Sequence, residues 1–222
     1  MTAVDMAHSL TLKDLRISLD GTCLLALDEV VKPGGVLTVM GPSGSGKSTL
    51  LSVLSGFREK AFEVSGRIFC GDLDITEWPP QQRRAGLLFQ DPLLFPHMSV
   101  GQNLVFAIPA EKRGRARRRA MAEAALSDIG LPDMFDRDPA TLSGGQAARV
   151  ALARTLLSSP AFVLLDEPFS KLDTELRQQM RELVFSTARQ SEWPMVLVTH
   201  DADDARAAGG KTINLSDAAH NG

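Results

Sequence analysis

Short apolar runs recur along the chain, separated by stretches with a different and more polar pattern. Four of these runs are four or five residues long and contain almost no polar side chain; they cover 36–40, 85–89, 162–165 and 195–199. Runs of this length and composition are typical of strands buried on both faces of a mostly parallel sheet. Helix-forming stretches lie between them, so the pattern predicts an α/β fold.

The segment 10–31 has another pattern. Its short pieces alternate apolar and polar residues on either side of Asp20-Gly21, a dipeptide that favours tight hairpin turns. We therefore expect an antiparallel flank beside the main sheet. Residues 67–70 are a candidate for a further strand of this flank.

The middle of the chain, from about 92 to 157, contains more alanine and arginine and fewer β-branched runs. Within it, 115–129 consists almost entirely of good helix formers. We interpret this section as a helical subdomain inserted into the α/β core. The expected organisation is a single domain over 1–222, in which about 1–91 and 158–222 form the core and its flank and about 92–157 form the helical subdomain.

A glycine-rich segment at 41–49 carries the strongest chemical signal. It fits the phosphate-loop pattern G-x-x-x-x-G-K-[ST] without a mismatch, between an apolar strand-like run and a helix-like run. The glycines let successive backbone N–H groups point at phosphate oxygens, and the helix start adds its positive dipole end. Lys47 is then expected to reach the β- and γ-phosphates, and the Ser48 hydroxyl to hold Mg²⁺. The predicted nucleotide-binding residues are Gly41, Pro42, Ser43, Gly44, Ser45, Gly46, Lys47, Ser48 and Thr49.

Two adjacent carboxylates follow the apolar run 162–165. A strand next to the one that enters the phosphate loop would bring Asp166 to the Mg²⁺ held by Ser48. Glu167, one residue further on, would then lie where it can take a proton from attacking water. Taken alone, Asp-Glu-Pro is equally a turn at the end of a strand. The phosphate loop upstream favours the catalytic interpretation.

A second anion site is predicted at 142–146, where a serine and two glycines precede a helix. A single ATP cannot easily use both sites of one chain if the helical subdomain holds the second at a distance. Two copies arranged head to tail can, with Ser143 of one copy closing on the γ-phosphate held by Lys47 of the other. ATP would then join the dimer and its hydrolysis would release it. The alternative is a plain capped helix. The residues expected to bind nucleotide here are Ser143, Gly144, Gly145 and Gln146.

The order of these motifs resembles that of the ATP-binding subunits of ABC transporters, over about 10–215. The resemblance implies a P-loop NTPase (RecA-like) core with an antiparallel flank and an inserted helical subdomain. It implies that Gln90 contacts Mg²⁺ or water and senses the γ-phosphate, that Asp173 bridges the two active sites of a dimer, and that His200 contacts the γ-phosphate and orients water. Residues 91–100 would touch the membrane subunit.

The resemblance also implies an ATPase that uses ATP and Mg²⁺. Its expected catalytic residues are Glu167, His200, Gln90 and Lys47, and its expected Mg²⁺ ligands are Ser48, Gln90 and Asp166. Segments 136–141 and 93–100 resemble those of importers, so we expect a subunit that powers solute import from the cytoplasmic face of the inner membrane. The implied partners are a second copy, permease subunits and an extracytoplasmic solute-binding protein, with no nucleic acid. An ATPase of an export or lipoprotein-release system is the alternative. A soluble ABC protein acting on DNA or ribosomes is disfavoured, since a second cassette and long insertions are not found.

Two positions depart from the family pattern. The family usually has an aromatic residue about two dozen positions before the phosphate loop, where it stacks on adenine. This chain contains no tyrosine and has Leu19 in the equivalent stretch, so an aliphatic contact would replace the stack and GTP stays open as a substrate. Lys171 stands where a small residue is more usual.

Composition narrows the remaining possibilities. A net charge of −3 provides no overall basic field that would recruit nucleic acid. We expect Cys23 and Cys70 to be reduced, buried packing residues, because they are far apart in apolar surroundings. The sequence has no zinc-ligand pattern and no apolar run that approaches the length of a membrane span. Residues 1–9 lack the basic start and apolar core typical of a signal peptide, so we do not expect one there.

One dense basic run, at 112–119, remains outside these motifs. Such a run binds nucleic acid or anionic lipid headgroups in some proteins and is a solvated helix face in others. The run has no accompanying aromatic residues for base stacking, and the rest of the chain is acidic on balance. From the sequence we favour the solvated helix face.

Overall fold

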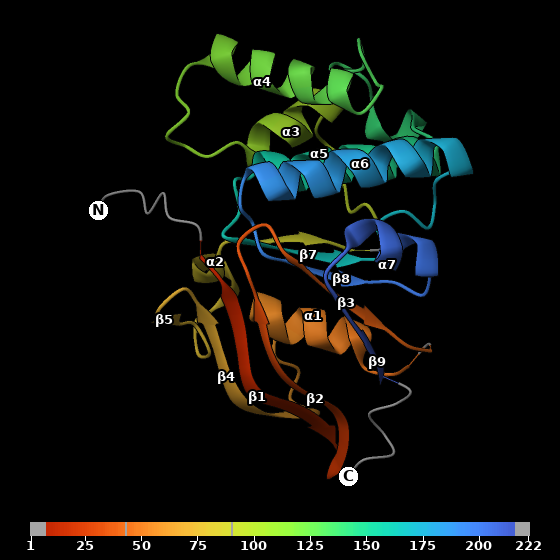
Figure 1. Ribbon diagram of the computed structural model, residues 1–222. Helices are drawn as coiled ribbons and strands as arrows, with labels where there is room; N and C mark the ends of the chain where they lie inside the picture. The colour runs from red at the N-terminus through yellow and green to blue at the C-terminus, as the bar shows by residue number, and fades with distance from the viewer. Residues whose placement is uncertain (1–7, 43, 90, 216–222) are drawn as a thin grey trace. The chain divides into compact units, whose positions relative to one another are not determined.

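Residues 8–42, 44–89 and 91–215 are described by the computed structural model (Figure 1). The chain divides into two units: one is formed from 1–85, 161–166 and 185–222, and the other from 86–160 and 167–184. The strands are β1 (Leu10–Leu19), β2 (Thr22–Val31), β3 (Val36–Met40), β4 (Phe62–Cys70), β5 (Leu73–Asp74), β6 (Ala85–Leu88), β7 (Phe162–Asp166), β8 (Met195–Val198) and β9 (Lys211–Asn214). The helices are α1 (Lys47–Ser55), α2 (Pro80–Arg83), α3 (Val100–Ala107), α4 (Arg115–Asp128), α5 (Gly144–Leu157), α6 (Thr174–Gln190) and α7 (Ala202–Ala208), with a 3-10 turn at Pro139–Thr141.

The first unit contains a parallel sheet with the strand order β7-β8-β3-β9. The predicted apolar runs form β3, β7 and β8 within one residue of their expected ends, and their side chains are almost all buried. Val198 of β8 pairs with Val39 of β3 on one side and with Asp166 of β7 on the other. These three strands therefore end at one level, at the edge where ligand sites of α/β proteins form.

The antiparallel flank of the first unit has the strand order β2-β1-β4-β5. Its hairpin turns at Asp20 (φ 50°) and Gly21 (φ 76°), two successive left-handed residues that make the tight turn expected from this dipeptide. Strand β4 extends the expected strand 67–70 toward the N-terminus, and it pairs with β1. The short strands β5 and β9 were not expected from the sequence, because β5 has two residues and β9 has the largely exposed sequence KTIN.

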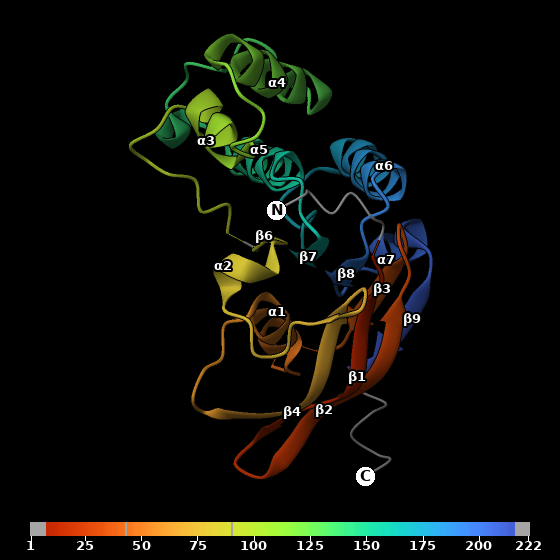
Figure 2. The ribbon, with the colours of Figure 1, turned by 90° about the vertical axis from the view of Figure 1, so that its left-hand side faces the viewer.

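Helix α1 lies between the two sheets of this unit (Figures 1 and 2). Four of its side chains are at most 2 % exposed and cover more than one face of the helix; these are Leu50, Leu51, Val53 and Leu54. The N-terminus of α1 follows the phosphate loop directly. The buried packing of α1 thus fixes the position of its N-terminus, and with it the position of the phosphate loop.

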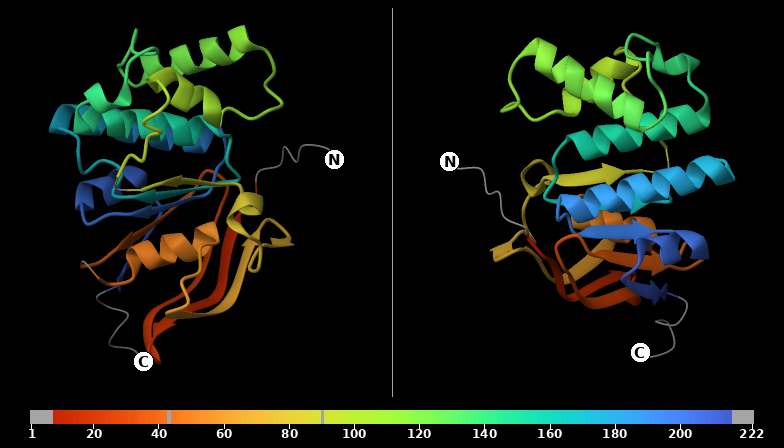
Figure 3. Two further views of the ribbon diagram at one scale, coloured as in Figure 1. Left: turned by 180° about the vertical axis from the view of Figure 1, so that it is seen from behind. Right: turned by 45° about the horizontal axis from the view of Figure 1, so that its top comes forward.

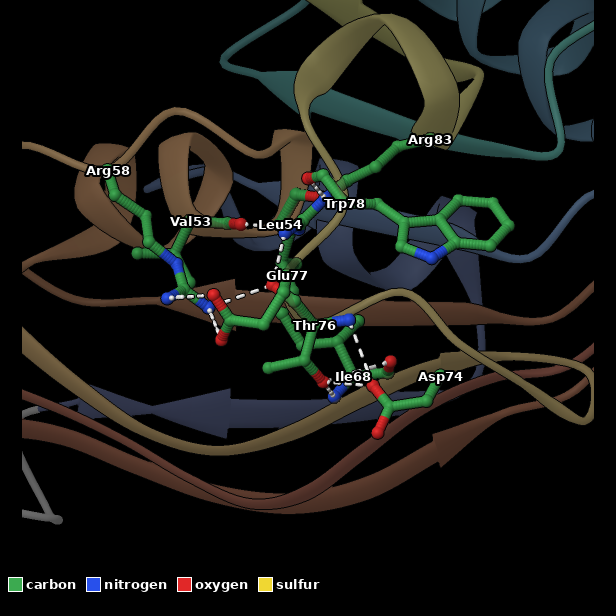
Figure 4. A network of polar contacts seen from close by, with 9 residues as sticks. All are labelled: Val53, Leu54, Arg58, Ile68, Asp74, Thr76, Glu77, Trp78 and Arg83. Atoms are coloured by element: carbon green, nitrogen blue, oxygen red, sulfur yellow. Dashed lines mark hydrogen bonds and ion pairs between the residues drawn. The ribbon is translucent and has the colours of Figure 1, made fainter.

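The C-terminal end of α1 is held by a buried arginine from α2. Arg83 is 3 % exposed and donates hydrogen bonds to the carbonyls of Val53 (2.8 Å), Leu54 (3.0 Å), Thr76 (2.7 Å) and Trp78 (2.9 Å), as Figure 4 shows. A cation at this end satisfies carbonyls that the helix leaves unpaired and interacts favourably with the helix dipole. Burial lowers the pKa of Arg83, yet a guanidinium stays charged in proteins.

Replacement of Arg83 by methionine should lower the free energy of unfolding by about 3 kcal/mol, because four carbonyls lose a buried charged donor. Arg58 is the matched control: it bonds the same Thr76 carbonyl, but its 35 % exposed side chain pairs with the exposed Glu77. Arg58→Met should cost about 1 kcal/mol or less. Urea unfolding measures both variants, and equal losses would contradict the role given to Arg83.

The second unit is mainly helical, and α3, α4 and α5 pack on one another within it (Figure 3). Helix α4 begins at the expected residue and ends one residue before the predicted end. Asn103 of α3 is fully buried and closes the loop before the helix: its Oδ1 accepts from the Phe95 backbone N–H (2.8 Å), and its Nδ2 donates to the carbonyls of Phe95, Met98 and Ser99. This loop belongs to the segment expected to meet a membrane subunit.

The expectation for the two cysteines is half wrong. Cys70, the last residue of β4, is buried, and this burial raises the pKa of its thiol. Cys23 is exposed, because it follows the hairpin turn at the start of β2, where the first two residues of the strand are both exposed. In the described part of the chain, no helix has both the length and the apolar character that a membrane span needs.

Candidate active site

The segment between β3 and α1 has the backbone that a phosphate loop needs. Gly44 (φ 82°) and Gly46 (φ 85°) are left-handed, a conformation that other residues adopt at a cost. A Cβ on Gly41 would lie 2.8 Å from Ser45 Oγ and 3.1 Å from the Leu215 Cβ, so a side chain there would displace the Ser45 hydroxyl and crowd Leu215. Ser43 lies outside the described residues.

Lys47, the first residue of α1, is 8 % exposed. Its Nζ donates to the carbonyls of Gly41 (2.8 Å) and Pro42 (2.7 Å), which hold the ammonium group beside the loop. Gly46, at the N-cap, offers no side-chain acceptor, so the first N–H groups of α1 are not capped by it. The loop therefore presents one cation and a helix N-terminus together, which suits a phosphate group.

Ser48 and Asp166 meet within the first unit. The Ser48 Oγ donates to Asp166 Oδ2 at 3.0 Å, although 118 residues separate them in the chain. A hydroxyl beside a carboxylate fits Mg²⁺, which prefers oxygen ligands and keeps water and phosphate oxygens in its remaining positions. The described residues contain no group of three His, Cys, Asp or Glu side chains that could hold a metal.

One further observation at the loop agrees with a phosphate ligand. Ser45 Oγ is buried, and it has no hydrogen-bond partner among the described residues. Buried hydroxyl groups in native proteins usually have a partner, so an unpaired one needs an explanation. A bound phosphate would provide an acceptor next to it.

His200 lies at the same edge of the parallel sheet as the phosphate loop. The Thr199 N–H donates to the carbonyl of Val39 (3.3 Å), which joins the end of β8 to the end of β3. The Thr199 hydroxyl donates to the buried Asp204 carboxylate (3.0 Å), and Asp201 caps α7 by accepting from two backbone N–H groups. These hydrogen bonds hold the turn that contains His200. His200 itself is exposed, and it lies at the carboxyl end of the strand run 195–199, as the sequence predicted.

Glu167 begins the second unit's segment after β7 and has a left-handed backbone (φ 46°). A non-glycine residue in this region costs about 1–2 kcal/mol, and such strain gathers at functional sites. Ser170 stabilises the turn, since its N–H (3.2 Å) and its hydroxyl (2.9 Å) both donate to the Glu167 carbonyl. Glu167 lines a small pocket of this unit together with Phe89, which precedes Gln90, and Pro92, which lies two residues after it. Gln90 itself lies outside the described residues.

Helix α5 of the second unit begins at the predicted second anion site. Ser143 and Gln146 form a capping box, in which Ser143 Oγ accepts from the Gln146 N–H (3.2 Å) and Gln146 Oε1 accepts from the Ser143 N–H (2.9 Å). A Cβ on Gly144 would meet no atom within 4 Å, and one on Gly145 would make only ordinary contacts. Nothing within the described chain thus requires glycine at these two positions. Their bare N–H groups suit close approach by an outside anion.

A protein-family model described as "ABC transporter" matches residues 24–170, more than half of the chain. The chain belongs to the ABC transporter family. It is 48 % identical over 199 residues to the "Uncharacterized ABC transporter ATP-binding protein YnjD" of Escherichia coli (strain K12), with 89 % of this chain and 91 % of that protein covered.

Relatives named as importers are also similar. The "Fe(3+) ions import ATP-binding protein FbpC 1" of Rhizobium meliloti (strain 1021) is 39 % identical over 196 residues, which cover 88 % of this chain and 55 % of that protein. The "Spermidine/putrescine import ATP-binding protein PotA" of Oleidesulfovibrio alaskensis (strain ATCC BAA-1058 / DSM 17464 / G20) is 39 % identical over 199 residues, covering 89 % and 52 %. The chain thus spans about half the length of these import proteins.

A solved structure agrees with the fold. The dimeric, post-hydrolysis structure of the ATP-binding cassette MJ0796 bound to ADP and Pi matches with a TM-score of 0.79 and 26 % identity, over 92 % of this chain and 93 % of that one. The predicted P-loop NTPase fold, with its antiparallel flank and helical insertion, is confirmed. The chain is an ABC ATPase.

Lys171, unusual for this ABC segment, has a partner in the structure. Its Nζ pairs with Asp91 Oδ1 at 2.9 Å, within the second unit. The pair links the segment that follows Glu167 to the residue after Gln90. Asp173, two positions on, accepts from the Leu176 N–H (3.0 Å) and so caps the start of α6. The Lys171–Asp91 contact could not be predicted from the sequence, because 80 residues separate the two side chains.

Leu24 is a residue near the phosphate loop that the sequence interpretation did not identify. A Cβ built on Gly46 would lie 3.7 Å from the Leu24 Cβ, so β2 approaches the loop at this point. Leu24 is half-buried, and it is the residue at which the pairing of β2 with β1 shifts its register. Leu19, the expected aliphatic replacement for the adenine stack, is half-buried at the end of β1. The sequence alone does not show that Leu24 lies next to the phosphate loop, because the fold brings these two segments together.

Proposed function

We propose that this ABC ATPase powers solute import through a membrane permease, and that two copies close around ATP to do so. The main observation in support of the dimer is the open start of α5. Gly144 leaves room there for an anion from outside the chain, and the fold itself does not require glycine at this position. Each copy would hold ATP on its own Lys47 and offer Ser143 and Gly144 to the ATP of the other. The dimeric state of the solved MJ0796 cassette supports this arrangement.

The site residues have distinct roles in the proposed hydrolysis. Lys47 and the N–H groups at the start of α1 bind and orient the β- and γ-phosphates. Ser48 and Asp166, joined at 3.0 Å, would hold Mg²⁺ together with Gln90, and the ion supplies charge neutralisation on the phosphates when it is bound. Glu167 accepts a proton from the attacking water, and His200 orients that water beside the γ-phosphate.

The loop before α3 is the proposed contact with the permease. Leu93 (58 %) and Phe106 (62 %) are exposed apolar residues of this region, and exposed apolar clusters mark interaction sites. The Phe106 ring lies 5.1 Å from that of Phe95, whose backbone is fixed by Asn103. We further propose that the whole of 1–222 acts as one ATPase domain, located peripherally on the cytoplasmic face of the membrane through the permease.

Import is favoured over export because the FbpC and PotA relatives are named as import proteins. Affinity purification of the tagged chain from membranes tests this directly, by identification of the integral membrane subunits that accompany it. We expect a permease whose ATPase activity in proteoliposomes rises when an extracytoplasmic solute-binding protein is added. Stimulation by a lipoprotein or another substrate on the cytoplasmic side would instead assign the chain to an export or release system.

The nucleotide base is predicted to rest on aliphatic side chains, so the site should discriminate little between ATP and GTP. Leu24→Ala should weaken the binding of both nucleotides by about fivefold to tenfold, since an apolar contact reads no base edge. Val30→Ala, also on β2 but 60 % exposed, is the matched control and should change neither affinity. Fluorescence titration measures these values. A loss of ATP affinity alone would show instead that the adenine edge is recognised.

A further inference from the structure

The basic run at 112–119 separates into two kinds of residues in the structure. Arg118 donates to the carbonyls of Val105 (2.8 Å), Ile108 (2.9 Å) and Pro109 (3.0 Å), and so closes the end of α3. Arg119 pairs with Glu123 (2.8 Å) and Asp136 (3.3 Å), and it lies over the Phe135 ring at 4.1 Å. These two arginines serve the fold of the second unit.

The other four cations form what we call the basic surface: Lys112, Arg113, Arg115 and Arg117. All four are exposed, and none of them forms an ion pair with a residue that the structure describes. The neighbouring Glu111 is exposed and pairs with none of them. The basic surface leads into α4, which lies on the outside of the helical layer of its unit (Figure 3).

Folding does not explain the charges of the basic surface. They stand at the positive end of the dipole of α4, where cations are unfavourable and acidic residues stabilise a helix. The first turn of α4 contains no acidic residue, and its N-cap, Gly114, has no side-chain capping bond. A sequence selected for helix stability alone would reverse this arrangement, and such local violations are expected where a residue has a function.

The charge distribution of the whole chain makes the basic surface distinct. The positions 112–119 hold six of the 24 basic residues and no acidic residue, which leaves 18 basic residues against 27 acidic ones elsewhere. A long polyanion such as nucleic acid would be repelled by most of this molecule. The segment 109–128 also has no aromatic residue on which a base could stack. These features favour, over a long polyanion, a flat anionic surface that the chain touches only at its basic surface.

We propose that the basic surface binds the anionic phospholipid headgroups of the membrane on which this ABC ATPase works. Each Lys or Arg near such a surface multiplies the partition coefficient by about five, so the four together would contribute about six-hundredfold at low salt. This contact would orient the helical unit at the bilayer, in addition to any binding through a permease. It goes beyond the proposed import function and does not depend on the direction of transport.

The test is sedimentation of the purified full-length chain with vesicles, in the absence of any permease. Phosphatidylcholine vesicles are compared with vesicles that contain about 30 mol % phosphatidylglycerol, a surface whose negative charge attracts polybasic segments. We expect binding to the anionic vesicles at about 50 mM salt, a strong reduction at about 300 mM because of screening, and little binding to phosphatidylcholine.

The decisive variant replaces Lys112, Arg113, Arg115 and Arg117 together by glutamine. Its matched control replaces four exposed cations of the first unit, Lys13, Arg16, Lys32 and Lys60, which gives the same net charge. The first variant should lose at least tenfold in anionic vesicle binding, while the control keeps most of it. Both should retain ATP affinity. If the fourfold variant is poorly folded, the double variant Arg115→Gln/Arg117→Gln replaces it. This double variant should lose at least fivefold in binding to anionic vesicles.

Several outcomes would overturn the proposal. These are equal binding of the parent to both kinds of vesicle, equal losses in the two fourfold variants, and vesicle binding that survives removal of the basic surface. Tighter binding to a single-stranded oligonucleotide than to anionic vesicles at the same phosphate concentration would assign the surface to nucleic acid instead. None of these outcomes depends on the permease, so each leaves the import proposal to its own experiment.

Discussion

Glu167→Gln is expected to lower steady-state ATP turnover by about a hundredfold or more, because a positioned general base contributes roughly 10²–10⁴ to the rate. The amide keeps the size of the side chain but cannot accept the proton of the attacking water. Since Glu167 is not part of the phosphate loop, ATP affinity should change by less than about threefold, within about 0.7 kcal/mol. Release of inorganic phosphate measures the first quantity, and nucleotide titration measures the second.

Glu192→Gln is the matched control for this prediction. Glu192 is also an acidic residue with a left-handed backbone (φ 53°), and it is exposed on a turn. The same chemical change at the same backbone conformation should leave turnover unaltered there. If Glu167→Gln hydrolyses ATP at the parent rate, the proton acceptor lies elsewhere in the site.

Lys47→Ala should weaken ATP binding by about tenfold to a hundredfold, because a charge-assisted hydrogen bond is worth about 1.5–3 kcal/mol. Lys47 also bonds the carbonyls of Gly41 and Pro42, so a modest loss of stability, about 1 kcal/mol, accompanies the change. Calorimetric titration and urea unfolding separate the two effects. Lys32→Ala, on the exposed turn after β2, is the control and should alter neither. Unchanged affinity in Lys47→Ala would remove the lysine from phosphate binding.

Most of the fold could be predicted from the sequence, because its strands are strongly patterned. The buried runs that became β3, β7 and β8 have almost no polar interruption, Thr38 within β3 being the exception, and Asp20-Gly21 specifies the hairpin turn chemically. Strand β9 could not be predicted, since an edge strand with exposed polar residues has no hydrophobic period. The exposure of Cys23 could not be predicted either, because the part of a hairpin that the core covers depends on tertiary packing.

The candidate site divides in the same way. Contiguous motifs located the phosphate loop, Asp166 and the start of α5, because phosphate binding requires certain residue types at fixed spacing. Contacts between distant segments were not predictable. Lys171 looked anomalous until its pairing with Asp91 was seen, and Leu24 lies near the phosphate loop only because β2 crosses beside it. The four carbonyls bonded by Arg83 are a further case, since no local pattern marks a buried arginine as a helix cap.

Light scattering of Glu167→Gln at saturating Mg-ATP distinguishes a nucleotide shared by two copies from one held within a single copy. The hydrolysis-deficient variant should be a dimer with ATP and a monomer without it. Adding Gly144→Gln, which fills space that no described atom occupies, should abolish the dimer and leave the ATP affinity of the monomer unchanged. Ala120→Gln, on the exposed face of α4, should have no effect. A monomeric Glu167→Gln at saturating Mg-ATP, or a Gly144→Gln variant that still dimerises or loses ATP affinity as a monomer, would contradict a site completed by the second copy.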